Sequence, residues 1–133
     1  MEEALYIRNF GDAVGAAMGI KDRFGRGHAA ALLAGDGLVL DLVVFTDRAH
    51  SIDNAIAYAT IMAPSLADLR SVVLFSAVRR DIRTIREHDV EIFERAKHEL
   101  APIDLLDWIL CNRKDVRSLA FTTGLSTWES ASA

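Results

Sequence analysis

The feature that most constrains this fold is a Gly-Asp-Gly turn between two apolar runs. In "HAAALLAGDGLVLDLVVFTD", Gly35-Asp36-Gly37 separates two segments of strand-like composition. Asp-Gly between such segments is a strong signal for a β-hairpin, because both residues tolerate the backbone angles of a tight turn. The second run, residues 38–45, is apolar on both faces, which predicts a central strand covered on both sides.

Helix-like and strand-like segments alternate through the rest of the chain. Ser51 or Asp53 is the expected cap of a helix that runs to about Met62. A later helix is expected within "TIREHDVEIFERAKHEL", because its apolar spacing is helical and Thr84-x-x-Glu87 matches a capping box. Three further strands are predicted in "RSVVLFSA", "IDLLDWILC" and "VRSLAF". The order β-β-α-β-α-β-β predicts an α/β sandwich, of mixed α and β type, around a mixed sheet.

The length of the chain bounds the number of domains. With 133 residues, 51% of them hydrophobic, the chain can bury one core but hardly two. We expect residues 1–26 to pack on a domain formed by residues 27–125, with residues 126–133 as a flexible tail. Within the first segment "DAVGAAMGI" has helix-like alanine content weakened by glycine, whereas "KDRFGRG" is interpreted as a loop.

Charge and hydropathy indicate which partners and which cellular compartment to expect. The net charge of −4 and a pI near 5.5 argue against a surface wholly committed to nucleic acid, although a local basic patch is compatible with both. The first residues carry acidic rather than basic charge, unlike a secretory signal. The apolar runs are shorter than the roughly 20 residues of a membrane-spanning helix. We therefore expect a soluble cytoplasmic protein that does not associate with membranes.

Few residues suggest metal or nucleophilic chemistry. Cys111, the single cysteine, lies in an apolar segment and is expected to be a buried thiol. Ser76 has no histidine near it in the sequence to act as a base, although one could approach it in space. Four histidines are widely scattered: His28, His50, His88 and His98. Because a metal site needs several converging ligands, we expect no metal and no cofactor.

Four arginines in "SAVRRDIRTIRE" stand at the junction between a predicted strand and a predicted helix. They would share a stripe if the segment is helical and would fan around a loop if it is not. With the helix N-terminus they could form an anion site. Alternatively, they pair with nearby acidic residues as a solvated charged surface. The candidate anion-binding residues are Arg79, Arg80, Arg83 and Arg86, and the candidate acidic partners are Asp81, Glu87, Asp89 and Glu91.

From Leu74 to Ser118 the chain resembles, without a gap, the RadC group of the JAB/MPN (Mov34) domain family. "LFSA" takes the place of that group's His-x-His-Pro segment, and "TIRE" that of its Ser-x-x-Asp helix start. "IDLLDWIL" matches its Leu-Leu-Asp-His strand, and "VRSL" its later serine. The resemblance covers about residues 27–121, with the hairpin matched in character. It implies a JAB/MPN-like (cytidine-deaminase-like) α-β-α sandwich.

The metal-binding residues of that family are absent from this sequence. Leu74 and Ser76 stand where the family has two histidines, Glu87 where it has aspartate, and Trp108 where a histidine follows Leu-Leu-Asp. One carboxylate cannot hold a zinc ion that needs about three protein ligands. No glutamate lies between Glu3 and Glu87 to serve as general base. Metalloprotease or deubiquitinase activity is therefore not expected. Leu74 indicates a packed pocket, and Glu87 is interpreted as the second half of its capping box.

The resemblance implies a catalytically inactive RadC-like domain that acts as a binding or assembly module. Its partner would be another protein or a second copy of the chain, because this fold often associates through helices and edge strands. An alternative is an enzyme of another type, or a small-molecule binder, that uses the Arg79–Arg86 loop for a phosphate or carboxylate. A third is nucleic-acid association, suggested by the DNA-repair label of the RadC group, although fold alone does not transfer function.

Overall fold

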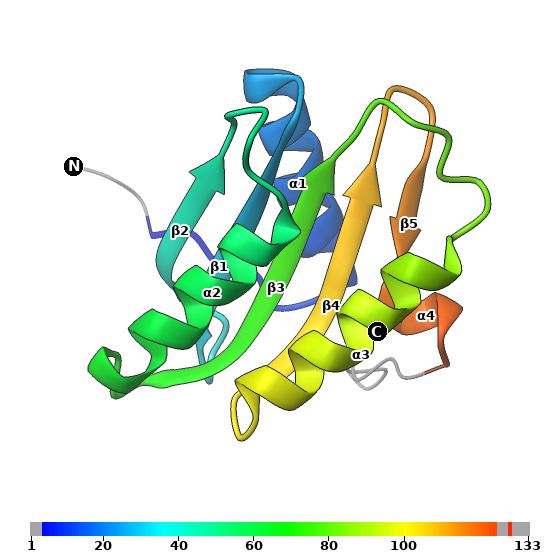
Figure 1. Cartoon of the computed structure of the whole chain (residues 1–133). Coiled ribbons are helices and arrows are strands. Elements are labelled where there is room, and N and C mark those ends of the chain that lie inside the picture. Colours follow the sequence, from blue (N-terminus) through cyan, green and yellow to red (C-terminus); the bar gives the residue numbers. More distant parts are fainter. Residues whose placement is uncertain (1–3, 125–127, 129–133) are drawn as a thin grey trace.

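A mixed five-stranded sheet forms the centre of the protein (Figure 1). The computed structural model describes residues 4–124 and Trp128. The strands are β1 (Gly27–Ala34), β2 (Val39–Phe45), β3 (Leu69–Ala77), β4 (Asp104–Cys111) and β5 (Val116–Ser118). The helices are α1 (Phe10–Phe24), α2 (Ile52–Met62), α3 (Glu87–Leu100) and α4 (Leu119–Thr122), with a 3-10 turn at Ala63–Ser65. The predicted order of strands and helices is present, with α1 and α4 added.

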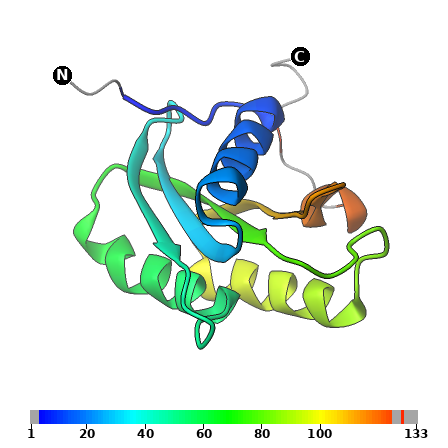
Figure 2. The ribbon, with the colours of Figure 1, turned by 90° about the horizontal axis from the view of Figure 1, so that it is seen from above.

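The strands lie in the order β2-β1-β3-β4-β5. Neighbouring strands are antiparallel except for β3 and β4, which are parallel and are joined through α3. Helices α2 and α3 cover one face of the sheet and α1 covers the other, which gives three layers (Figure 2). The mixed α/β class that the sequence predicts is therefore confirmed.

Two apolar clusters hold the layers together. On the face of α2 and α3, Leu74 and Leu110 pack with Phe93, whereas on the face of α1, Phe75 and Ile109 lie in the second cluster. Successive residues of β3 and β4 thus point to opposite cores, as the two-residue period of a strand requires. These strands are almost continuously apolar because both of their faces are covered.

The predicted hairpin is confirmed, but β2 is not central. Strands β1 and β2 pair in antiparallel fashion, with a shift of register between Leu32 and Leu33 near the turn. In the turn, Gly37 has φ 90°, and a side chain there would meet Ile7 O at 2.8 Å. β2 is an edge strand whose residues are half-buried, with Leu42 exposed. The prediction of a central strand was wrong, because apolar composition indicates that a strand can be buried but does not determine its position in the sheet.

The ends of helices α1 and α3 differ from the prediction. Helix α1 includes Lys21–Phe24, which was predicted as a loop, and it ends at Gly25, where φ is 75°. Helix α3 begins at Glu87 after the N-cap Arg86, and no side chain caps it. The Thr84-x-x-Glu87 capping box is therefore absent, and Glu87 does not have the role in it that the sequence suggested.

The last predicted strand is shorter than "VRSLAF". It ends at Ser118, whose side chain accepts a hydrogen bond from Phe121 N and so begins α4. Ser51, one of the two residues predicted as a cap, is the N-cap of α2 and forms a capping box with Asn54. The predicted tail, residues 126–133, lies outside the described residues except for Trp128. Within the described chain, no helix is both long and apolar enough to cross a membrane.

Candidate functional site

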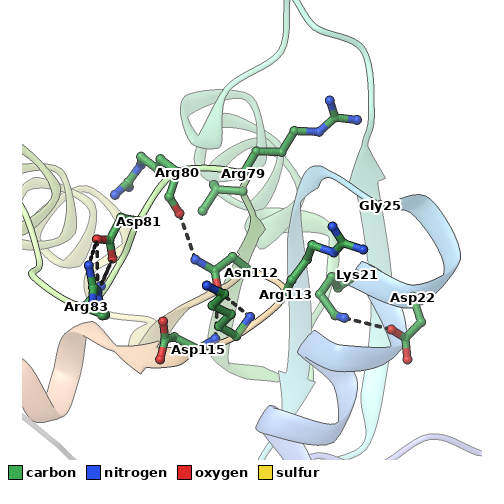
Figure 3. A pocket seen from close by; sticks show the side chains of 12 residues that line it. Lys21, Asp22, Gly25, Arg79, Arg80, Asp81, Arg83, Asn112, Arg113 and Asp115 are labelled. Atoms are coloured by element: carbon green, nitrogen blue, oxygen red, sulfur yellow. Dashed lines mark hydrogen bonds and ion pairs between the residues drawn. The ribbon is translucent and has the colours of Figure 1, made fainter.

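A polar pocket of about 870 Å³ lies at the carboxyl ends of β3 and β4 (Figure 3). In open α/β sheets, ligands bind preferentially outside the carboxyl ends of parallel strands, where the following loops diverge. Here the loop after β3, the turn after β4 and the last turn of α1 form the walls. The lining residues are Lys21, Asp22, Gly25, Val78, Arg79, Arg80, Asp81, Arg83, Asn112, Arg113, Lys114 and Asp115.

The lining carries six basic and three acidic side chains, in a protein whose net charge is −4. Positive charge is therefore concentrated at this end of the sheet. It comes from three separate segments of the chain. Of the arginines that the sequence singled out, Arg79, Arg80 and Arg83 line the pocket, and Arg86 does not. Residues 78–86 form a loop, so these arginines do not share a helical stripe.

Some of these arginines are neutralised within the loop. Arg83 binds Asp81 through Nη2 and Oδ2 at 2.8 Å, and its backbone N–H also donates to that carboxylate. These hydrogen bonds lower the pKa of Asp81 to about 2. Both side chains are exposed, so the pair shapes the loop more than it stabilises the fold.

Arg80 and Arg86 share a buried carboxylate. Arg80 Nη2 lies 2.9 Å from Asp89 Oδ2, and Arg86 Nη2 lies 3.0 Å from Asp89 Oδ1. The Asp89 side chain is 1% exposed. Burial opposes its ionisation, but the two guanidinium groups outweigh burial and lower the pKa of Asp89. These two arginines therefore anchor the loop on the first turn of α3.

Three basic side chains of the pocket remain unpaired. Arg79, Arg113 and Lys114 are exposed, and their side-chain nitrogens have no hydrogen bond or ion pair with any residue that the structure describes. Lys21, on the opposite wall, pairs with Asp22 at 3.1 Å. Arg79 was a candidate from the sequence. Arg113 and Lys114 were missed, because only the parallel pairing of β3 with β4 brings their turn beside Arg79.

The residues that the sequence analysis compared with metal ligands are Leu74, Ser76 and Glu87. Leu74 is fully buried in the core beneath α2 and α3. Ser76, also fully buried, lies with its Oγ 2.7 Å from His28 Nδ1 and accepts a hydrogen bond from Trp108 Nε1 at 2.9 Å. Glu87 is exposed at the start of α3. Within the described residues, no three His, Cys, Asp or Glu side chains converge to hold a metal ion.

The Ser76–His28 pair is structural. Burial, followed by the charges of Arg26, Arg80 and His50, lowers the pKa of His28, so the imidazole is neutral near pH 7. A neutral histidine beside a serine hydroxyl is the geometry of an activated nucleophile. However, Ser76 is 0% exposed, and no substrate atom can reach its oxygen. The sequence left open whether a histidine approaches Ser76 in space, and the structure identifies His28, which is 48 residues away along the chain.

A second buried polar centre is Asp107. Its carboxylate accepts hydrogen bonds from Ser118 Oγ at 2.5 Å, Ala120 N at 3.0 Å and Trp128 Nε1 at 2.8 Å. Burial raises the pKa of Asp107 despite these donors. The side chain is fully buried and ties β4 to β5 and α4. Cys111 is buried as predicted, and burial raises the pKa of its thiol.

Comparison with known proteins found no family model that matches this sequence and no curated protein that is similar to it.

Proposed function

We propose that the protein is a binding module for an anionic ligand, which it takes up in the pocket at the carboxyl ends of β3 and β4. The single observation that carries this proposal is the presence of three unpaired basic side chains, Arg79, Arg113 and Lys114, in one pocket. Arg80 pairs with Asp89 of α3, which it shares with Arg86, and Arg83 pairs with Asp81. These contacts hold the loop, although Arg80 Nη1 has no hydrogen-bond partner among the described residues. Guanidinium groups suit phosphate and carboxylate oxygens, which they bind through two parallel hydrogen bonds.

Calorimetric titration with inorganic tripolyphosphate tests the proposal. At low ionic strength the wild-type protein binds the probe, and Arg79→Ala or Arg113→Ala weakens binding about tenfold or more, because each substitution removes charge-assisted hydrogen bonds. Arg48→Ala is the matched control, since Arg48 is exposed and lies outside the pocket lining. Absence of binding by the wild-type protein, or equal binding by all variants, would overturn the proposal.

We also propose that the module resembles the RadC group in fold and has no zinc chemistry. The order of strands and helices supports the likeness, and the packing of Leu74 together with the hydrogen bonds of Ser76 argues that the residues do not fit a zinc ion. After incubation with zinc and dialysis, elemental analysis should find far less than one zinc ion per chain. A stoichiometric, tightly held zinc ion would contradict this.

Assembly of two copies is a second candidate function, favoured by strand β2. Only its start is covered, where Val39 N donates to Leu5 O at 2.8 Å, and the remaining outer edge has no strand partner among the described residues. An apolar edge strand is prone to pair with another chain. Sedimentation should then show dimers that Leu42→Lys disrupts, whereas a monomer at all concentrations would exclude this route.

Nucleic acid is a less favoured ligand for the pocket. Its lining contains no aromatic side chain on which bases could stack. Binding of a single-stranded oligonucleotide would therefore depend on phosphates alone, and it would be independent of sequence and steeply dependent on salt. Sequence-selective binding would show that recognition occurs elsewhere on the protein.

A further inference from the structure

The two unpaired arginines of the pocket stand on different loops. Arg79 follows β3 and Arg113 follows β4. Figure 3 shows Arg113 extending toward Lys21 and Gly25 and Arg79 extending toward the upper right of the view, whereas Arg80 and Arg83 lie at the left. The unpaired guanidinium groups of the pocket are therefore divided between two loops, and Lys114 adds a third unpaired positive charge on the loop of Arg113.

One side chain fixes the two loops relative to each other. Asn112 Nδ2 donates to Arg80 O at 2.9 Å, which holds the loop after β3. Asn112 Oδ1 accepts from Lys114 N at 2.9 Å and from Asp115 N at 2.8 Å, which closes the turn after β4. Since Arg79 and Arg113 are the immediate neighbours of residues in this network, the carboxamide of Asn112 holds their backbones at a set separation.

The rest of the loop is also held in place. The shared carboxylate of Asp89 binds Arg80 and Arg86, and Asp81 binds Arg83. Side-chain contacts therefore hold the loop that carries Arg79 and the turn that carries Arg113. A ligand that bridges them does not have to order two loops when it binds, which lowers the entropic cost of binding.

We propose that the pocket selects ligands with two linked anionic groups, of which a diphosphate is the simplest, one group bound by Arg79 and the other by Arg113. This inference rests on the proposed function. A guanidinium group is matched to one phosphate, and once the first phosphate is bound, a covalently linked second one reaches the other arginine at high effective concentration. Asn112 acts as a positioning residue, because it sets the separation of the two arginines without contacting the ligand.

The ratio of affinities for inorganic pyrophosphate and inorganic orthophosphate is the test. Calorimetry at a pH where both are ionised should show pyrophosphate bound about tenfold or more tightly by the wild-type protein. In Arg79→Ala and in Arg113→Ala the ratio should fall to within about twofold, because each variant lacks one of the two arginines that the linked phosphates bridge. Arg48→Ala, a change outside the lining, should keep the wild-type ratio.

Asn112→Ala separates positioning from folding. It should lower the ratio toward that of the single arginine variants while the affinity for orthophosphate stays within about twofold of wild type, since either arginine alone still binds one phosphate. If Asn112 had only a structural role, the Asn112→Ala variant would lose affinity for pyrophosphate and for orthophosphate by the same factor. Equal affinities of the wild-type protein for the two anions would overturn the inference and leave anion binding intact. Absence of any phosphate or tripolyphosphate binding would overturn the proposed function itself.

Discussion

The hydroxyl of Ser76 lies 2.7 Å from Nδ1 of His28, and this contact joins the centre of the sheet to the start of β1. Ser76 also accepts the indole N–H of Trp108, which is 3% exposed. One buried oxygen thus satisfies polar groups from two neighbouring strands. The Ser76 hydroxyl is therefore a polar link between β3 and the two strands on either side of it.

Removing that oxygen should destabilise the protein. Ser76→Ala leaves the indole N–H of Trp108 buried without an acceptor, which costs about 1–3 kcal/mol in the free energy of unfolding. Urea denaturation measures the change. Ser71→Ala is the control, because Ser71 lies on the same strand and its hydroxyl makes no hydrogen bond within the described chain. If both variants lose the same stability, the hydrogen bonds of Ser76 contribute little.

Leu74 should behave as a core residue. Leu74→Ala should lower the free energy of unfolding by about 2–5 kcal/mol, because the side chain is fully buried and leaves a cavity. Leu74→His should also destabilise, and zinc should not raise its melting temperature, since no set of ligands surrounds the new imidazole. Thermal melting with and without zinc checks this. A zinc-dependent rise would mean that the position still belongs to a metal site.

Asp89 should make stability depend on pH in the acid range. Its pKa is lowered in the folded state from about 3.8, so its ion pairs contribute fully above that value and are lost as the pH falls through the lower folded pKa. Asp89→Asn should cost about 3 kcal/mol at pH 7. It should also flatten the decline of stability below pH 4. Denaturation across pH measures both effects, with the exposed Asp104→Asn as control.

Two candidate caps offer a direct comparison. Ser51→Ala should destabilise by about 1 kcal/mol, because the Ser51 hydroxyl caps α2. Thr84→Ala should be nearly neutral, because α3 begins at Glu87 and Thr84 is exposed in the preceding loop. Chemical denaturation of the two variants distinguishes the caps. A larger loss for Thr84→Ala would mean that a capping box forms at α3.

Sequence rules were successful for elements that are determined by residues close together in the chain. The hairpin around Gly35-Asp36-Gly37 and the cap at Ser51 depend on residues a few positions apart, and both were confirmed. The Thr84-x-x-Glu87 prediction was wrong, because α3 begins at Glu87 with Arg86 as its N-cap. In the structure Asp89, in the first turn of α3, binds Arg80 and Arg86 of the preceding loop.

The amino-acid sequence by itself determined the mixed α/β class, the order of the strands and helices from β1 to β5 and the apolar strands β3 and β4, because these follow from local periodicity and turn chemistry. Only the tertiary structure decided that β2 lies at an edge and that His28 meets Ser76. It also decided which arginines are free. Pairing of β3 with β4 places Arg113 beside Arg79, and the choice of ionic partner depends on distances between side chains, which the sequence does not contain.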